Sequence, residues 1–419
     1  MRRWRLFLTN FVLILILTPF LTQSQLPPGD QMARIHAFTR PLEFDYTSWL
    51  WHAWETKIAF GTMGAERRVD PATDRQIVLD YLDLMGDINR NEARLRDALA
   101  DPNGVDEAKV NALREQLAKD YDRRTWLAPL AEQVLQAQIS AVLAENGLGL
   151  GGQPMPPVLY RTTPVPMALI VSPRTEIRQI ANISLEPNLT LEQQIRLEDE
   201  VAQALDVSTL VVPIGGVGVY PTMVMQTDNL PWLVETIAHE WTHNYLDWHP
   251  LGLHYDTSPA LRTMNETTAS IVGKEIGRMV LEQYYPDKVP PPPPPPSTQT
   301  QNNTQNNPPA FDFRAEMRKT RVHVDELLAE GKVEEAEAYM EQRRRFFWEH
   351  GYHIRKLNQA YFAFYGAYAA SPGGAAGEDP VGAAVRQLRA ESPSVAAFLK
   401  RIAWMSSYED LQKALGEKK

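Results

Sequence analysis

The stretch ETIAHEWTHNYLDWH, residues 235–249, places three of the chain's nine histidines within eleven residues. His239, Glu240 and His243 have the spacing H-E-x-x-H. Residues four apart lie on the same face of a helix, so both imidazoles can bind one tetrahedrally coordinated metal ion. Glu240 then stands beside the ion, where a general base can take a proton from a metal-bound water. The spacing therefore predicts a metal site on a helix.

The flanking sequence supports a helix at this place. PWLVETIAHEWTHNYLDW has apolar residues at helical spacing. Pro231 suits the first turn, and Asn229 or Asp228 suits the cap before it. The alternative is a pair of histidines that only pack within a helix.

Two residues compete for the position of the third ligand. His249 lies ten residues after His239, which is the ligand spacing of the metzincin pattern H-E-x-x-H-x-x-G-x-x-H. Leu246 occupies the glycine position of that pattern, where the chain turns back in a conformation that suits leucine poorly. The other candidate is Glu266, which follows His243 after 22 intervening residues.

Glu266 lies in LRTMNETTASIVGKEIG, residues 261–277, a segment with helical spacing. Glu266, Gly273 and Gly277 fall along one side of this predicted helix, together with Ser270. The two glycines allow another backbone to come close, which is needed when two helices share one small ion. The sequence therefore favours Glu266 as the third ligand and leaves His249 as the alternative.

HEWTH followed by NETTA resembles the gluzincins, the thermolysin and M1 aminopeptidase group of zinc metallopeptidases, over residues 235–277. The resemblance implies a zincin-like catalytic core in which His239, His243 and Glu266 hold Zn²⁺. It implies a peptide or protein substrate, hydrolysed through a zinc-bound water that Glu240 activates. The G-x-M-E-N segment of the M1 aminopeptidases is missing, which leaves the exact family open.

The same resemblance makes Asn265 a residue that supports the ligand beside it. Ser270 stands where thermolysin-like enzymes have an aspartate, the partner of a ligand histidine. Because ligand imidazoles need an acceptor for their second nitrogen, we expect that acceptor at Asp247, Asp256 or a backbone carbonyl.

Hydrolysis of a peptide also needs a donor, besides the metal, for the oxyanion that develops. FFWEHGYHIRKLNQAYFAFYGAYAA, residues 346–370, is the region richest in such side chains. His353 and Tyr361 are our candidates for this catalytic role. Tyr361 lies four residues from both Leu357 and Tyr365, so a stripe of core aromatics is the alternative interpretation.

The charge balance limits the kinds of partner, and the N-terminal sequence indicates where the protein is located. With 52 acidic and 42 basic residues and a net charge of −10, the chain has no basic stripe for nucleic acid. Three arginines precede an apolar run of 16 residues, 6–21, which predicts an export signal. A cleaved signal peptide (secreted protein) and a retained anchor (protein held at the membrane, facing outward) both stay open. The absence of cysteine excludes disulfides.

The expected fold class is α+β, mainly α. A zincin-like catalytic core with a small edge sheet and two ligand helices is flanked by helical N- and C-terminal regions. The regions are 1–30 as a signal peptide or membrane anchor, 31–150 as an N-terminal helical region, 151–285 as the zinc catalytic core, 286–310 as a Pro-rich and Gln/Asn-rich linker or insert, and 311–419 as a C-terminal helical region.

Several local features are also predicted. Two long helices should pack as a hairpin within residues 31–150, and Thr190 should cap a helix. Pro213 and Pro221 should confine their strands to sheet edges, since proline cannot donate to a ladder. An edge strand just before the H-E-x-x-H helix could then pair with an extended peptide. The other explanation is an edge that proline blunts against aggregation.

A protein of another class fits the same residues. It is a non-catalytic envelope protein, in which zinc braces two helices and the long helices bind a partner. A structural zinc site requires a fourth protein ligand and no open position. His249 is the residue that could close the site in this way.

Overall fold

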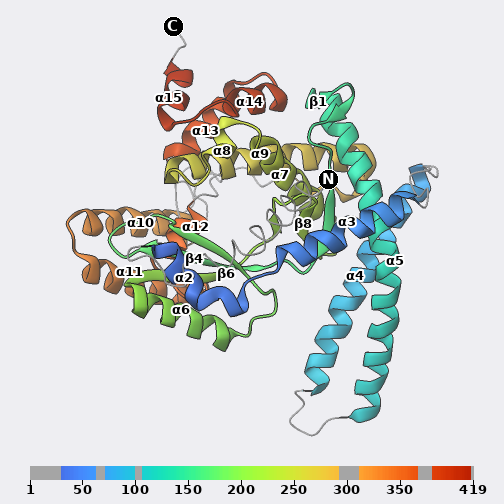
Figure 1. The fold of residues 1–419 in the computed structure, drawn as a ribbon, viewed down its shortest axis with the longest axis horizontal. Helices are drawn as coiled ribbons and strands as arrows, with labels where there is room; N and C mark the ends of the chain where they lie inside the picture. The colour runs from blue at the N-terminus through green and yellow to red at the C-terminus, as the bar shows by residue number, and fades with distance from the viewer. Residues whose placement is uncertain (1–29, 63–70, 100–105, 292–310, 367–379, 417–419) are drawn as a thin grey trace, which may run out of the picture.

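The computed structural model describes residues 30–62, 71–99, 106–291, 311–366 and 380–416 (Figure 1). It is mainly helical with small sheets, which confirms the α+β, mainly α class. The predicted signal peptide or anchor lies outside the described residues, except for Asp30, and so does most of the Pro-rich and Gln/Asn-rich segment. None of the helices in the described ranges combines the length and the apolar character that a membrane span requires.

The N-terminal region contains the predicted helical hairpin. Its helices are α2 (Gln31–Thr39), η2 (Arg40–Leu42), α3 (Tyr46–Thr62), α4 (Pro71–Leu99) and α5 (Glu107–Glu145). α4 and α5 lie side by side over most of the length of α4 (Figure 1). Their apolar stripes meet in a core that includes Val78, Leu82 and Leu135. The Tyr285 hydroxyl donates a hydrogen bond of 2.9 Å to Gln138 Oε1, which ties α5 to the end of a later helix.

An antiparallel sheet in the order β5–β4–β6 forms the centre of one half of the molecule. Its strands are β4 (Met167–Pro173), β5 (Ala181–Leu185) and β6 (Val207–Pro213), and α6 (Leu191–Leu205) connects the last two. Leu169 and Val171 pack with α2 and α6 on one face, whereas Ile170 faces the C-terminal helices. The sheet is therefore buried on both faces. Thr190 caps α6 as predicted, in a capping box with Gln193.

A second sheet has the order β3–β8–β7, with β3 (Tyr160–Thr163), β7 (Gly216–Val217) and β8 (Thr222–Met225). β8 pairs in parallel with β3 and antiparallel with β7. The prediction that Pro221 marks an edge strand is wrong, because β8 lies between β3 and β7. Pro221 comes just before the first residue of β8, so its missing N–H removes no hydrogen bond from the sheet. The edge strand near the H-E-x-x-H helix is β7 instead. A small ribbon of β1 (Gly149–Leu150) and β2 (Gln153–Pro154) completes the sheets of the described residues.

Two helices form the frame of the predicted site. They are α7 (Leu230–Leu246) and α9 (Pro259–Tyr284), separated in the chain by the short α8 (Pro250–Leu253) and followed by η3 (Pro286–Lys288). Asn229 caps α7 by accepting a hydrogen bond of 3.0 Å from Trp232 N. Ser258 caps α9 through a 3.2 Å hydrogen bond from Leu261 N. Both caps satisfy backbone donors that a helix start leaves open.

The glycine pair of α9 sets its distance from α7. A Cβ atom at Gly273 would lie 2.8 Å from Glu235 O and 3.0 Å from His239 Cβ. A Cβ at Gly277 would lie 3.0 Å from the Glu235 backbone. Any side chain at either position would push the helices apart, which confirms the close approach predicted from the sequence.

The C-terminal region divides between the two halves of the molecule (Figure 1). α10 (Phe313–Ala329), α11 (Val333–Glu349) and α12 (Gln359–Tyr365) cover the β5–β4–β6 sheet. α13 (Pro380–Glu391), α14 (Val395–Ile402) and α15 (Tyr408–Gly416) pack against α9 on its other side. The chain after residue 310 therefore contacts both the sheet and the ligand helices.

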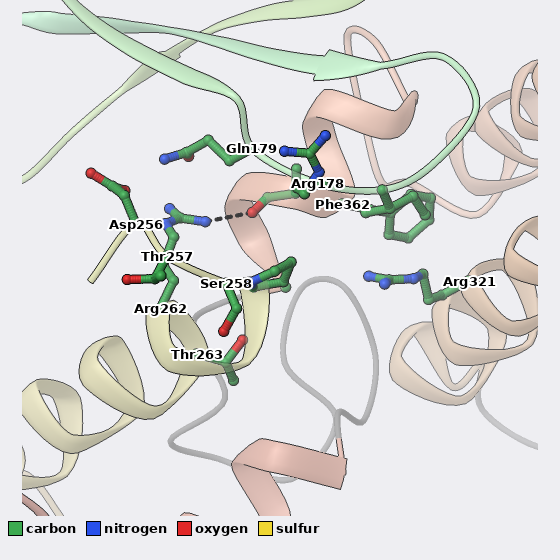
Figure 2. A pocket seen from close by; sticks show the side chains of 13 residues that line it. Arg178, Gln179, Asp256, Thr257, Ser258, Arg262, Thr263, Arg321 and Phe362 are labelled. Carbon is green, nitrogen blue, oxygen red and sulfur yellow. Dashed lines mark hydrogen bonds between the residues drawn. The ribbon is translucent and has the colours of Figure 1, made fainter. Parts of the chain in front are cut away.

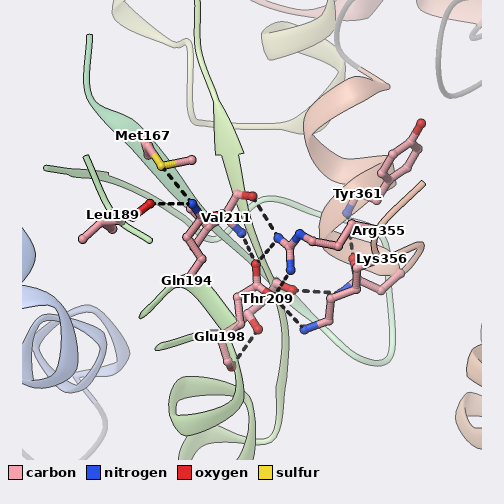
Figure 3. A network of polar contacts seen from close by, with 10 residues as sticks. Met167, Leu189, Gln194, Glu198, Thr209, Val211, Arg355, Lys356 and Tyr361 are labelled. Atoms are coloured by element: carbon pink, nitrogen blue, oxygen red, sulfur yellow. Dashed lines mark hydrogen bonds and ion pairs between the residues drawn. The ribbon is translucent and has the colours of Figure 1, made fainter. Parts of the chain in front are cut away.

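A buried carboxylate anchors the segment before α12 to β6, as Figure 3 shows. Glu198 Oε1 accepts hydrogen bonds from Val211 N at 2.6 Å and from Arg355 at 2.5 Å. Its Oε2 lies 3.3 Å from Lys356 Nζ. The Asn358 amide donates to the Thr209 carbonyl at 2.9 Å. These contacts fix where α12 begins and so decide which of its residues reach the site.

Replacing Arg355 with alanine is expected to lower the free energy of unfolding by about 2–3 kcal/mol, because Glu198 stays buried with a weakened counter-charge. Urea unfolding measures this change. The matched control is Arg345→Ala, which removes an exposed pair with Glu341 and should change stability by less than about 0.5 kcal/mol. Equal effects of the two substitutions would show that this network does not anchor the segment.

Candidate metal centre

α7 and α9 bring two histidines and a glutamate together. His239 Nε2 and His243 Nε2 are 3.1 Å apart. Glu266 Oε2 lies 3.7 Å from the first and 3.5 Å from the second. These three residues form a group able to hold a metal ion, and within the described residues no fourth His, Cys, Asp or Glu belongs to it.

The spacing of the donor atoms fits a small divalent ion. Tetrahedral bonds of about 2.0–2.1 Å place neighbouring donor atoms about 3.3–3.4 Å apart. The three measured separations, 3.1, 3.5 and 3.7 Å, bracket that value. Glu266 Oε2 is buried and makes no hydrogen bond within the described part of the chain, so its lone pairs face the two imidazoles alone. An ion shared by these atoms satisfies all three.

The electrostatics of the group also favour a cation. Burial raises the pKa of Glu266, but His243 and His239 outweigh it and hold that pKa well below its usual range. Burial lowers the pKa of His243, but Glu266, followed by Glu240, raises it to about 9. Both directions mean that positive charge between these groups is stabilised.

Neighbouring polar groups orient the three ligands. Ser270 Oγ lies 3.4 Å from His239 Nδ1, so the serine itself takes the place that we expected Asp247, Asp256 or a backbone carbonyl to fill. Asn265 is among the groups that raise the pKa of His243, which agrees with its expected supporting position. Such contacts fix the orientation of the ring and strengthen a metal ligand.

The second oxygen of Glu266 is held by a tyrosine. The Tyr255 hydroxyl donates a hydrogen bond to Glu266 Oε1. Burial, followed by the charge of Glu266, raises the pKa of Tyr255 well above its usual value, so the phenol stays protonated and remains a donor. Arg262 Nε donates in turn to the Tyr255 hydroxyl at 3.3 Å. Arg262, Tyr255 and Glu266 therefore form a chain of hydrogen bonds that leads to the metal group.

Glu240 lies beside the group, at the wall of the cleft. It is buried, and burial raises the pKa of its carboxyl although His239 and His243 oppose the shift. A Cβ atom at Gly216 of β7 would lie 2.5 Å from Glu240 Oε1. Only a glycine at this position leaves room for the carboxylate between α7 and the edge strand.

The group opens into a cleft of about 710 Å³. The lining of the cleft comes from β7 with its flanking residues, from α7, from the start of α9 and from the segment around Tyr255. Asn182 and Ser184 of β5 line the cleft from the larger sheet, and Phe364 and Tyr365 line it from α12. A cleft of this size accommodates several residues of an extended peptide.

The structure places His249 away from the metal group. Its Nδ1 lies 2.8 Å from the Tyr245 carbonyl, and its ring stacks on Tyr245 with centroids 4.5 Å apart. The Trp404 ring covers it from another side at 5.3 Å. His249 does not line the cleft, so of the two candidates for third ligand the structure brings only Glu266 to His239 and His243.

The structure brings neither His353 nor Tyr361 to the cleft. The His353 ring packs against Trp348 with centroids 4.2 Å apart. Tyr361 is 8 % exposed and belongs to the apolar cluster between α12 and the sheet, as its alternative interpretation implied. Tyr365, four residues later on α12, lines the cleft instead.

Sequence reasoning overlooked Tyr255 and Arg262. Both lie among the 22 residues between His243 and Glu266, a segment that must stay near the ion if both of its ends bind it. Its length was therefore a signal that polar residues inside it could contact the ligands. The spacing of Arg262 and Glu266, four residues apart on one helix, was a second signal.

Comparison with protein-family models, with curated proteins and with solved structures gives no match to this chain. The chemistry of the site is therefore inferred from the geometry of its own residues.

Proposed function

We propose that the protein is a metal-dependent hydrolase, and more particularly a zinc-dependent peptidase of the gluzincin type. One observation carries the proposal. His239, His243 and Glu266 converge with the spacing of a zinc site, while the buried Glu240 lies beside them at the wall of a long cleft. A catalytic zinc site uses three protein ligands and keeps one position open, which these residues fit.

When bound, zinc polarises a carbonyl and lowers the pKa of a bound water to about 7. Glu240 takes the proton of the attacking water and later returns it to the amine that leaves. Glu240 is buried and lines the cleft beside the metal group, which is the position that this exchange requires. Tyr255 keeps Glu266 in place and acts as a positioning residue.

The edge strand β7 suits an extended substrate. Its outer edge is not paired within the described residues, and its Gly216 lies directly against Glu240. A peptide that adds to this edge through backbone hydrogen bonds would present a carbonyl next to the catalytic base. Tyr365 lines the same cleft and replaces Tyr361 as our candidate donor for the oxyanion.

A metal-removal experiment tests the proposal. The protein is incubated with a mixed peptide library before and after chelation, and then after addition of zinc. We expect hydrolysis to stop on chelation and to return with one equivalent of zinc, because the proposed reaction uses the ion as its Lewis acid. Zinc binding in the absence of any hydrolysis would favour the structural zinc protein with a partner-binding surface.

The location of the protein enters the proposal through the N-terminal sequence alone. We propose an exported protein that is either secreted or held at the membrane by residues 1–30 with the catalytic region facing outward.

A further inference from the structure

The polar side chains around a smaller hollow of the molecule find their partners within the chain. This hollow has a volume of about 80 Å³ and lies between the β4–β5 connection, the start of α9, α10 and α12 (Figure 2). Arg262 donates a 2.5 Å hydrogen bond to the Ala363 carbonyl, and Arg321 pairs with Asp325 at 2.7 Å. The outer face of α3 is different, because its apolar side chains stay exposed.

α3 carries an exposed apolar stripe along one side. Trp51, Trp54 and Ile58 follow one another at intervals of three and four residues, so they lie in line on one face of the helix. Trp51 is 74 % exposed, Ile58 61 % and Trp54 40 %. Single apolar side chains on a surface need no explanation, but a row of them on one helix face indicates a surface that contacts a partner.

The inner face of α3 fixes which side is turned outward. Trp49 Nε1 donates to Thr163 Oγ1 of β3 at 3.2 Å. Lys57 Nζ pairs at 2.8 Å with Glu132 Oε2 of α5, a carboxylate that is itself buried. Ala53 lies between these two contacts and is buried as well. The helix therefore cannot roll and bury its stripe without breaking both contacts.

The chain before α3 indicates what covers the stripe. The apolar run of the predicted export signal ends at residue 21, and the described chain begins at Asp30. Residues 22–30 span at most about 30 Å, so a retained anchor keeps the start of α2 within that distance of the bilayer. Only residues 40–45 separate α2 from α3. Such an anchor lies within the bilayer, so it is not free to pack on α3 itself.

The side chains of the stripe suit a lipid interface. The tryptophan ring combines a large apolar area with one N–H donor, and tryptophans gather where hydrocarbon meets the lipid headgroups. A helix with such a face lies in the plane of the interface and buries that face. The stripe carries no charge, and beside it Glu55 lies 3.5 Å from His52 Nδ1. The contact is therefore apolar rather than electrostatic.

We propose that α3 lies on the surface of a lipid bilayer and places Trp51, Trp54 and Ile58 in its interface. The inference rests on the membrane-held form of the exported protein proposed above, and it does not depend on peptidase activity. The ring of Trp54 lies 6.1 Å from the ring of Tyr220, which follows Val219 of the cleft lining. The contact therefore holds one side of the cleft close to the bilayer.

A dye attached at one position of the full chain tests the proposal, because the chain contains no cysteine. Thr47 lies one turn before Trp51 on the same line, so Thr47→Cys keeps all three apolar side chains. The protein with a polarity-sensitive dye at residue 47 is added to phosphatidylcholine vesicles that contain a nitroxide lipid, and the vesicles are floated. We expect a blue shift of the emission and quenching by the nitroxide. Both should persist at raised salt, because screening acts on charges and not on an apolar contact.

Two further proteins serve as controls. Leu253→Cys places the same dye on α8, at another apolar position that is 72 % exposed, and should show neither the shift nor the quenching. Trp51→Ser combined with Ile58→Ser in the Thr47→Cys chain should lose both signals, while residues 1–30 still carry the protein to the vesicles. All these positions are exposed, so the substitutions leave the core intact.

Flotation and the dye report separately on the anchor and on α3. A chain that floats with the vesicles while the dye at residue 47 stays in water would retain the anchor and overturn the contact of α3. A blue-shifted emission that needs no vesicles and resists the nitroxide would show that protein, such as a second copy of the chain, covers the stripe, and would overturn it too. Equal signals from residues 47 and 253 would overturn the assigned face. A chain that does not float would overturn both the anchor and the contact.

Discussion

Replacing Glu266 with alanine is expected to abolish stoichiometric binding of zinc. Loss of a group that only orients a ligand costs 10–100-fold in metal affinity, and loss of a ligand costs more, so we expect a decrease above about 100-fold. The variant also leaves His239 and His243 as two ligands without the carboxylate that stabilises positive charge between them. The metal content of the purified protein, measured by mass spectrometry against protein concentration, gives the result directly.

The matched control is His249→Ala. This histidine has the spacing of a metzincin ligand, but its ring lies against Tyr245 and Trp404, so we expect one equivalent of zinc to remain. Zinc that is lost from His249→Ala and retained by Glu266→Ala would contradict the structure. The site would then be metzincin-like, or closed and structural, and the proposal of an enzyme would lose its basis.

The second large effect is expected for Glu240→Gln. This substitution keeps the size of the side chain and removes its ability to accept a proton. General acid–base catalysis contributes about 10²–10⁴-fold to a rate, so we expect kcat for peptide hydrolysis to fall by that factor. Zinc should remain at one equivalent, because Glu240 is not part of the metal group.

Glu235→Gln provides the comparison for this loss. Glu235 lies on the same helix and lines the same cleft, so the change in charge is the same and only the position differs. We expect kcat to change by less than about tenfold, since this carboxylate is no candidate for the base. A Glu240→Gln protein that binds zinc and hydrolyses peptides at the rate of the unmodified protein would refute the assigned base.

The metal group could be predicted because the positions of its residues follow from short stretches of sequence. His239 and His243 depend only on the period of one helix, and the caps at Asn229 and Thr190 depend on the residues that follow them. The pair Gly273 and Gly277 predicted that another helix packs closely here, but the pair did not show which helix that is. Glu266 was then the carboxylate on the glycine side of the second helix.

The part of the cleft that α12 lines could not be predicted in the same way. Tyr361 and Tyr365 are one helical turn apart, and nothing local decides which of them faces the metal group. The decision comes from the docking of Arg355 and Asn358 on β6, far away in the sequence.

The residues that line the cleft come from distant parts of the chain, so they are synthesised at different times. A ribosome that has completed α9 has already produced all three metal ligands. The face of the sheet that carries Ile170 is still uncovered at that moment, because α10–α12 follow later. Phe364 and Tyr365 are also missing, so the cleft lacks a wall. A chain that ends after α9 therefore contains the three residues of the metal group but not yet the complete lining of the cleft.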